Sequence, residues 1–377
     1  MSNFAENFYN SSKKEFSEMS TYSVITGTGS YLPEKIVKNE DFLSNEFFDS
    51  NGDKITTPTT QIIEKFKEIT TIESRRHATD EQNTSDLAKI AAERAIESSG
   101  IDREELDYVI VAHNFAETYA DNKRINILPI LAALVKQKLG IRNPGAVAYD
   151  ILFGCPGWIQ ALIQADYFIK SGDAKKVLVV GADILSRISD PHDRDSMIYA
   201  DGAAAVIVEG VESDVPVGII GHNTRSDNYE FSQMLRMGYS YNQEEAEKKE
   251  YYLKMNGRRL YQYALEFVPQ TIKAGLDKLN LHVKDVHKVL LHQANGKMDD
   301  AIISRLFRLY DIKKVPADVM PMTISWLGNS SVATVPTLFD LLVRGELDAQ
   351  KTTKDDIIVL ASVGAGMSIN SVIYKMP

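Results

Sequence analysis

Three segments in the first half of the chain are matched by three segments in the second half at one constant separation of 180 residues. "EELDYVIVAHN" from Glu104 corresponds to "KDVHKVLLHQA" from Lys284, and "KVLVVGA" from Lys176 corresponds to "DIIVLAS" from Asp356. The same separation sets "CPGWIQAL" against "VPTLFDLL". One match between apolar strands would mean little, but three in one register predict two copies of a single strand–helix unit.

Short runs of β-branched residues alternate with helical stretches along the chain, from "YSVITGTGSYL" near the start to "IIVLASVGAG" near the end. This alternation is typical of the α/β class, with strands buried between helices. We therefore expect a loose tail over residues 1–20, a first half over 21–212 and a second half over 213–377. The charged segment "YNQEEAEKKEYY" (241–252) is expected to be a solvated flap or helix without chemistry of its own.

The composition excludes several classes of protein. The 377 residues are 44% hydrophobic and 25% charged, which is typical of a globular protein. A net charge of −10 argues against a nucleic-acid partner, and no apolar run approaches the roughly 18 residues needed to insert into a membrane. A single cysteine rules out an internal disulfide framework. Because the first residues also lack the pattern of a signal peptide, we expect a cytoplasmic protein.

The one cysteine, Cys155, lies in "ILFGCPGWIQALIQ", between an expected strand and the start of an apolar helix. A lone cysteine is most often an inert, buried, small hydrophobic residue. A helix start, however, carries partial positive charge and unpaired N–H groups that favour a thiolate. Since the thiolate is the nucleophilic form, Cys155 is also a candidate nucleophile for acyl transfer.

Three further polar motifs follow Cys155 along the chain. "LLHQAN" ends an expected strand with His292 and Asn295, and "WLGNSSVATVP" places Asn329 in a loop before the helix of the second copy. "SVGAGM" near the end is a tight turn whose N–H groups are suited to binding an oxyanion. Taken singly these signals are weak, because a histidine at a strand end or a Gly-Asn-Ser turn is usually structural.

Taken together and in this order, the motifs resemble those of the β-ketoacyl-acyl-carrier-protein synthase III family of the thiolase superfamily. The resemblance runs over about residues 22–377 and includes "GTGSYLPEKIVKN" and "DGAAAVIVEG". It implies an α/β thiolase fold, in which duplicated βαβ-type halves form a layered αβαβα arrangement. It also implies a homodimer and a cytoplasmic acyltransferase that requires neither a cofactor nor a metal ion.

The resemblance further implies a Claisen condensation of two acyl thioesters through an acyl-Cys155 intermediate. The nucleophile Cys155, His292 and Asn329 would form the catalytic triad, the last two stabilising the negative oxygen of an enolate-like species. Backbone N–H groups of the set Cys155, Gly364, Ala365 and Gly366 would hold the tetrahedral oxyanion.

Some positions depart from the family pattern. Relatives that use coenzyme A clamp its nucleotide with a tryptophan and an arginine, and our alignment places Lys65 and Ile69 there. This departure favours acyl groups delivered on an acyl carrier protein over coenzyme A. Lys297 matches a family position for carrier docking, and Arg258 and Arg259 are expected to complete a basic patch despite the net charge of −10.

The loop after "VIVAHN" is long and polar, and its Glu117 is a candidate extra base, although a solvated loop acid is the commoner case. These departures suggest a specialised enzyme of lipid or polyketide biosynthesis, such as the dialkylresorcinol-type ketosynthases that condense two acyl groups and then cyclise them to a dialkylcyclohexanedione or resorcinol precursor. Three alternatives stay open: a housekeeping fatty-acid initiation synthase, a Cys-His-Asn thioester hydrolase or acyltransferase, and an inactive partner subunit.

Overall fold

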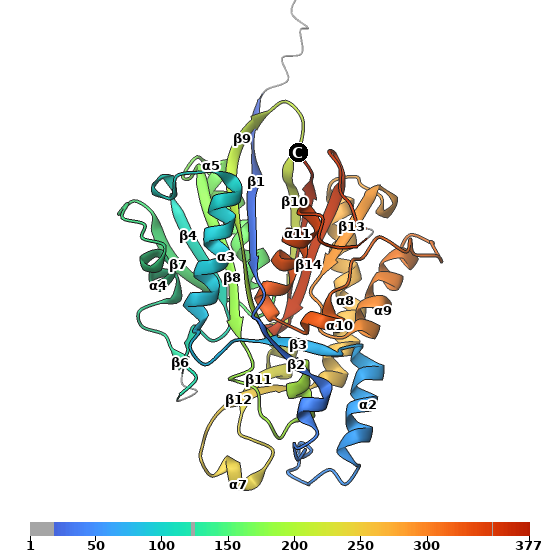
Figure 1. Cartoon of the computed structure of the whole chain (residues 1–377). Helices are drawn as coiled ribbons and strands as arrows, with labels where there is room; N and C mark the ends of the chain where they lie inside the picture. Colours follow the sequence, from blue (N-terminus) through green and yellow to red (C-terminus); the bar gives the residue numbers. More distant parts are fainter. Residues whose placement is uncertain (1–18, 122–124, 349) are drawn as a thin grey trace, which may run out of the picture.

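Two β-sheets form the centre of the molecule (Figure 1). The structure is a computed structural model that describes residues 19–121, 125–348 and 350–377. Residues 1–18, most of the expected tail, lie outside this range. The chain leaves the first sheet at Ser213 and enters the second at Gly218. Each half of the chain therefore supplies one sheet.

The two sheets share one order over four strands, and the first sheet has β7 as a fifth strand. In the first the order is β1-β9-β8-β4-β7, and in the second it is β10-β15-β14-β13. Parallel pairing links β8, β4 and β7 in the first sheet and β14 and β13 in the second. The strands are β1 (Ser20–Tyr31), β4 (Tyr108–His113), β7 (Val147–Leu152), β8 (Lys176–Ile184), β9 (Asp201–Ser213), β10 (Gly218–Ser226), β13 (Val286–Leu291), β14 (Ile357–Gly364) and β15 (Ser368–Lys375).

Two apolar helices, α5 and α11, lie between the sheets. Their side chains share one buried cluster with inward-facing residues of both sheets, including Val179 of β8 and Leu360 of β14. Helices α3 and α4 cover the outer face of the first sheet, and α8 and α9 cover that of the second. The helices are α3 (Thr84–Ser99), α4 (Leu131–Lys138), α5 (Gly157–Ser171), α8 (Gly257–Lys278), α9 (Gly296–Arg308) and α11 (Thr334–Val343).

The layers follow the order helix, sheet, helix, sheet, helix, which confirms the expected αβαβα arrangement (Figure 1). The matches at a separation of 180 residues pair β4 with β13, β8 with β14 and α5 with α11. Each pair occupies equivalent places in the two sheets or in the shared central layer. Strands buried on both faces read as continuous apolar runs, which is why the repeat was visible in the sequence.

Most of the smaller elements gather near the carboxyl ends of the parallel strands, and several of them share a separate apolar cluster that includes Phe66, Met197 and Ile324. The charged segment 241–252 contains one short helix, α7, and the next element, β12, begins at the last residue of this segment. The smaller elements are β2 (Lys35–Lys38), α2 (Thr59–Thr70), β3 (Ser74–His77), β5 (Glu117–Thr118), β6 (Ile125–Asn126), η3 (Arg194–Ile198), α6 (Asn228–Phe231), β11 (Leu235–Gly238), α7 (Gln243–Ala246), β12 (Tyr252–Met255) and α10 (Ile324–Leu327), with short 3-10 turns η1 (Asn39–Phe42), η4 (Ser232–Met234), η6 (Ser331–Ala333) and η7 (Ala365–Met367). Two further 3-10 turns, η2 (Arg103–Glu105) and η5 (Val283–Asp285), precede β4 and β13 and therefore lie at the amino ends of these strands.

Within the described part of the chain, none of the helices combines the length and the apolar character needed to cross a membrane. The same residues contain no group of three or more His, Cys, Asp or Glu side chains arranged to hold a metal ion.

Candidate active site

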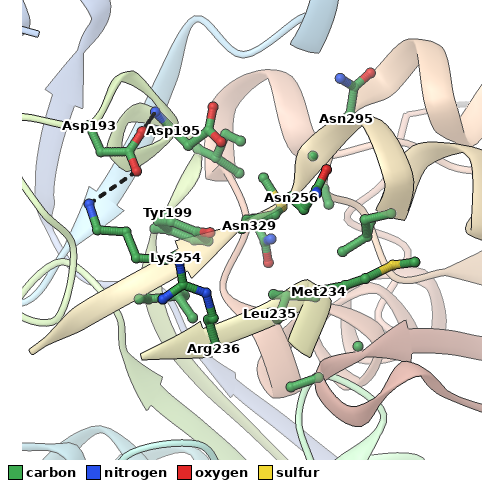
Figure 2. Close-up of a pocket in the computed structure, with 18 of the residues that line it drawn as sticks. Asp193, Asp195, Tyr199, Met234, Leu235, Arg236, Lys254, Asn256, Asn295 and Asn329 are labelled. Carbon is green, nitrogen blue, oxygen red and sulfur yellow. Dashed lines mark hydrogen bonds and ion pairs between the residues drawn. The ribbon is translucent and has the colours of Figure 1, made fainter. Parts of the chain in front are cut away.

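A cavity of about 1310 Å³ opens between the two halves of the chain. It is bounded by α2, by the β11–β12 hairpin and by the loops that follow the central strands. Cys155, His292 and Asn329, which come from three distant parts of the sequence, all line it. Figure 2 shows Asn329 at the centre of this cavity. The structure therefore brings the three predicted triad residues to one site.

Cys155 lies after β7 and two residues before the first residue of α5, and it is half-buried. The glycine-rich turn after β14 packs directly against it. A side chain at Gly364 would place its Cβ 2.6 Å from the Cys155 nitrogen, and one at Gly154 would lie 2.8 Å from the Ala365 nitrogen. Only glycines permit this approach of two backbones. The backbone of Cys155 and the turn 364–366 therefore face the same part of the cavity.

A chain of hydrogen bonds that the sequence analysis missed ends on the cysteine sulfur. The amide Nδ2 of Asn114 donates to Asp183 Oδ2 and to Ser331 Oγ, each at 2.6 Å. Because a carboxylate only accepts, Asp183 fixes the orientation of this amide. The Ser331 oxygen accepts from Asn114, so its own hydrogen points to Cys155 Sγ at 3.3 Å. Ser331 thus holds the Cys155 sulfur in a fixed orientation.

Burial raises the pKa of the Cys155 thiol to about 11, despite the hydrogen bond from Ser331. The nearby charge of Asp183 also raises this pKa. The sequence analysis had expected the helix start to favour a thiolate. In the structure, removal of the sulfur from water is the larger effect, because desolvation penalises the charged form. At physiological pH the Cys155 side chain is therefore a neutral thiol.

The raised pKa predicts how fast Cys155 reacts with iodoacetamide at different pH values. Below the pKa, each pH unit raises the thiolate fraction about tenfold, so the alkylation rate should climb about tenfold per unit from pH 7 to 10. An unperturbed thiol, with a pKa of about 8.5, would level off near pH 9. As the chain has one cysteine, the mass of the intact protein reports this site alone. A rate that levels off between pH 9 and 10 would contradict the prediction.

His292 follows the last residue of β13 and is held by its backbone N–H, which donates to the Ala361 carbonyl at 2.8 Å. Its side chain is buried, and Nδ1 has no hydrogen-bond partner in the described residues. Burial lowers the pKa of His292 to about 4. The imidazole is therefore neutral at physiological pH and is suited to act as a neutral donor.

Asn329 lies after Gly328, whose φ of +69° turns the chain back toward the first sheet. Its backbone is joined to the residue that precedes β9, because the Ala200 N–H donates to the Asn329 carbonyl at 2.8 Å. Its side-chain Oδ1 accepts from the Ser331 N–H at 2.8 Å. This contact directs the amide Nδ2 of Asn329 to act as a donor toward the cavity. Ser331 thereby links the asparagine to the cysteine.

Glu117, the candidate extra base, does not line the cavity. It is buried, and its two oxygens accept from the Ser85 N–H at 2.8 Å and from the Ser85 hydroxyl at 2.7 Å. Ser85 belongs to the first turn of α3. The carboxylate thus serves to satisfy the start of a helix, where negative charge is favourable. Within one chain the geometry gives no support to a role of Glu117 in proton abstraction.

The three expected carrier-docking cations are all exposed. Arg258 lines the cavity at the start of α8, while Arg259 lies over the ring of Phe231, at 5.9 Å from its centroid, and Lys297 lies at the start of α9. Lys65 and Ile69 line the cavity from α2, and neither of the two tryptophans of the chain does so. The structure therefore places Lys65 and Ile69 at the cavity, where we expected them to replace a nucleotide clamp.

Known proteins with similar sequences and folds point to one family. The family model described as 3-Oxoacyl-[acyl-carrier-protein (ACP)] synthase III matches residues 149–228, and the model of its C-terminal part matches residues 276–376. A β-ketoacyl-[acyl-carrier-protein] synthase III of Ehrlichia canis is 33% identical over 357 residues, which are 94% of this chain and 99% of that protein.

Two solved structures show the same architecture. The 3-oxoacyl-[acyl-carrier-protein] synthase III of Aquifex aeolicus has a TM-score of 0.75 and 28% identity, covering 94% of this chain and 99% of the other. The priming β-ketosynthase of the R1128 polyketide pathway has a TM-score of 0.77 and 28% identity, covering 94% and 96%. The α/β fold is thus the thiolase fold that the motifs implied. The chain belongs to the 3-oxoacyl-[acyl-carrier-protein] synthase III family of condensing acyltransferases.

Proposed function

We propose that this chain joins two acyl thioesters by a Claisen condensation through an acyl group carried on Cys155. The observation that supports the proposal most strongly is the single cavity that holds Cys155, His292 and Asn329, with Ser331 bonded to both the sulfur and the asparagine. A hydrolase that uses a Cys-His pair needs a histidine in contact with the sulfur. Here the hydrogen bond that reaches the sulfur comes from Ser331 instead.

The first half-reaction is a thioester exchange. The sulfur of Cys155 attacks the acyl carbonyl carbon, the bond from that carbon to the donor sulfur breaks, and the donor leaves as a thiol with the proton that Cys155 gives up. In the tetrahedral species, negative charge on the carbonyl oxygen is stabilised by backbone N–H groups of Cys155 and the turn 364–366.

In the second half-reaction, a second thioester supplies a carbon nucleophile formed by loss of CO₂ or of a proton. Neutral His292 and the amide of Asn329 stabilise the negative oxygen of this enolate. The enolate carbon attacks the acyl carbonyl, and the carbon–sulfur bond to Cys155 breaks. The leaving thiolate becomes the free thiol by taking up one proton, which balances the proton lost from the second thioester or, after loss of CO₂, comes from water. Neutral donors suit this step because the charge exists only near the transition state.

The proposed enzyme is a specialised one that takes two long acyl groups and releases a condensed or cyclised product. Two observations support this subtype over housekeeping initiation. The cavity of about 1310 Å³ exceeds the roughly 300–1,000 Å³ typical of small-molecule sites, which leaves room for two chains. Lys65 and Ile69 line its α2 wall in place of the family's nucleotide clamp. Intact-protein mass spectrometry with a panel of acyl thioesters tests loading, and mass analysis of the released product distinguishes linear from cyclic compounds.

The acyl donors are expected to arrive on a carrier protein rather than on coenzyme A. For one acyl group, kcat/KM should be at least about tenfold higher on the carrier and should fall with added salt, since exposed ion pairs are weak and screened. Lys297→Ala should reduce kcat/KM for the carrier-bound substrate. Lys284 is an exposed lysine at the other end of β13, and Lys284→Ala should leave this kcat/KM unchanged. Equal performance of the coenzyme A thioester, without salt dependence on the carrier, would refute this route.

The chain is also expected to form a homodimer through β7. This strand forms one edge of the first sheet, and its residues Val147 and Leu152 are 49% and 70% exposed. In the loop before α4, Ile127 and Leu128 are 65% and 74% exposed. Unpaired edges and apolar patches of this kind are normally covered. Light scattering should give twice the chain mass of 42.1 kDa, and Leu128→Arg should shift it toward a monomer. A monomeric wild-type protein at micromolar concentration would contradict the expectation.

A further inference from the structure

One wall of the cavity carries a group of charged side chains that the proposed condensation does not use. Lys254 of β12 is only 2% exposed, and its Nζ donates to Asp190 Oδ2 at 2.5 Å and to Asp193 Oδ2 at 3.3 Å. The same Nζ lies 3.4 Å from the centroid of the Tyr241 ring. Figure 2 shows Lys254 and Asp193 joined across this wall. Two carboxylates and the Tyr241 ring therefore surround this ammonium group.

A third carboxylate, that of Asp195, has no partner among the described residues. It lines the cavity from η3, and its side chain makes neither a hydrogen bond nor an ion pair with them. Its own N–H donates to Asp193 Oδ1 at 3.0 Å, which holds the two residues in a fixed relation. Burial and the charge of Asp193 raise the pKa of Asp195 to about 7, against the opposing charges of Arg194 and Lys254. Near neutral pH the carboxyl group is thus able both to donate and to accept a hydrogen bond.

Tyr199, four residues further on, gives an independent observation at the same place. It is 5% exposed, it lines the cavity, and its hydroxyl is buried without a hydrogen-bond partner among the described residues. Burial and the charges of Asp195 and Asp193 raise its pKa, so the phenol stays protonated. Figure 2 shows the Tyr199 ring reaching from the wall with Lys254 toward Asn329. Buried polar groups are nearly always paired, so this hydroxyl lacks a partner that a ligand would supply.

Apolar side chains form much of the remaining wall around these two groups, together with the polar side chains of Arg236 and Asn256 (Figure 2). Met234, Leu235 and Leu253 line the cavity, as does Met197 beside Asp195 in η3. A plain alkyl chain would satisfy these apolar side chains but would leave Asp195 and Tyr199 desolvated and unpaired, at a cost of about 1–3 kcal/mol for each group. A cationic group would have to give up its own hydration and would meet the positive charges of Lys254 and Arg236 on the same wall. A neutral hydroxyl group fits best, because it donates one hydrogen bond and accepts another.

We propose that Asp195 and Tyr199 form a polar subsite of the acyl cavity that binds a hydroxyl group carried on the chain of the substrate. The ligand hydroxyl donates to the Asp195 carboxylate and accepts from the Tyr199 phenol. The substrate class is therefore a hydroxylated acyl thioester rather than a saturated one. This inference deepens the proposed function and rests on it, because it concerns the acyl group that Cys155 receives.

The test compares a medium-chain saturated acyl thioester with isomers that bear one hydroxyl group at successive carbons. Intact-protein mass spectrometry follows the rate at which each acylates Cys155. At least one hydroxylated chain should load about 10–100 times faster than the saturated chain. Asp195→Leu and Tyr199→Phe should each remove most of this preference, and Asp195→Asn should keep part of it, because an amide still bonds a hydroxyl.

Tyr310→Phe is the matched control, since the Tyr310 hydroxyl is also buried and unpartnered but lies away from the cavity. This variant should keep the full preference. A wild-type enzyme that loads the saturated chain as fast as every hydroxylated isomer would overturn the subsite, as would a preference that survives in both Asp195→Leu and Tyr199→Phe. If no thioester acylates Cys155, the proposed function fails, and equilibrium binding of the same chains to Cys155→Ala still decides whether the hydroxyl group is recognised.

Discussion

Replacing Cys155 with alanine is expected to abolish acyl transfer. The wild-type protein should gain the mass of one acyl group when it is mixed with acyl-carrier thioesters, and Cys155→Ala should gain none. Condensation should fall by at least about 10⁴-fold, because loss of a covalent nucleophile removes both half-reactions. Intact-protein mass spectrometry and product formation measure the two effects separately.

The substitution removes one sulfur atom from a half-buried position, so the fold should tolerate it. The midpoint of thermal unfolding should stay within a few degrees of the wild-type value, which serves as the control for a misfolded variant. Since Cys155 is the only cysteine, no second thiol is present to accept the acyl group. An adduct that persists in Cys155→Ala would show that another side chain is the acyl acceptor.

The fold was predictable from the sequence to the extent that buried strands and helices repeat. The matches that start at Lys176 and Asp356 became β8 and β14, which hold equivalent positions in their sheets. The elements near the cavity mouth were less visible. β11 and β12 form a two-stranded hairpin. Lys254 of β12 is buried in contact with Asp190, a residue 64 positions away. Charge in a sequence is usually solvated, and only tertiary packing shows that this lysine is not.

The candidate site was predictable where a residue's role is tied to a local motif. Cys155, His292 and Asn329 each lie next to a strand end or a glycine-rich turn, and all three reach one cavity. Ser331 was in the same quoted segment as Asn329 but was not singled out, because its contact to the sulfur depends on packing across the two halves. Glu117 illustrates the reverse case, since a loop position suggested exposure and the structure places it beneath α3.

Local motifs also fail to predict electrostatics. The helix start suggested a stabilised thiolate at Cys155, whereas burial raises its pKa to about 11. Desolvation is a property of the whole enclosing surface, and residues from both halves form the cavity around this sulfur. The same reasoning holds for Asp195, because its raised pKa reflects burial beside Asp193 in a place that no local motif marks as enclosed.

His292→Ala and Asn329→Ala are expected to separate the two half-reactions. Each should still form the acyl-Cys155 adduct, because we propose that backbone N–H groups of the turn 364–366 hold the oxyanion of the loading step. Each should lose about 10²–10³ in the rate of carbon–carbon bond formation, the usual effect of removing one oxyanion donor. Chase of the preformed adduct with the second thioester measures this step alone.

The pH dependence of the same chase experiment tests the charge state of His292. Burial lowers the pKa of this imidazole to about 4, so the neutral donor persists from pH 8 down to pH 5 and is lost only as the pH falls through 4. The chase rate should therefore show no inflection near pH 6.5. His287→Ala, which removes a half-exposed histidine at the far end of β13, is the matched control and should leave the rate unchanged. Near-normal condensation by His292→Ala or Asn329→Ala would refute the role of that residue, because a donor that stabilises the enolate is indispensable to this step and irrelevant to loading.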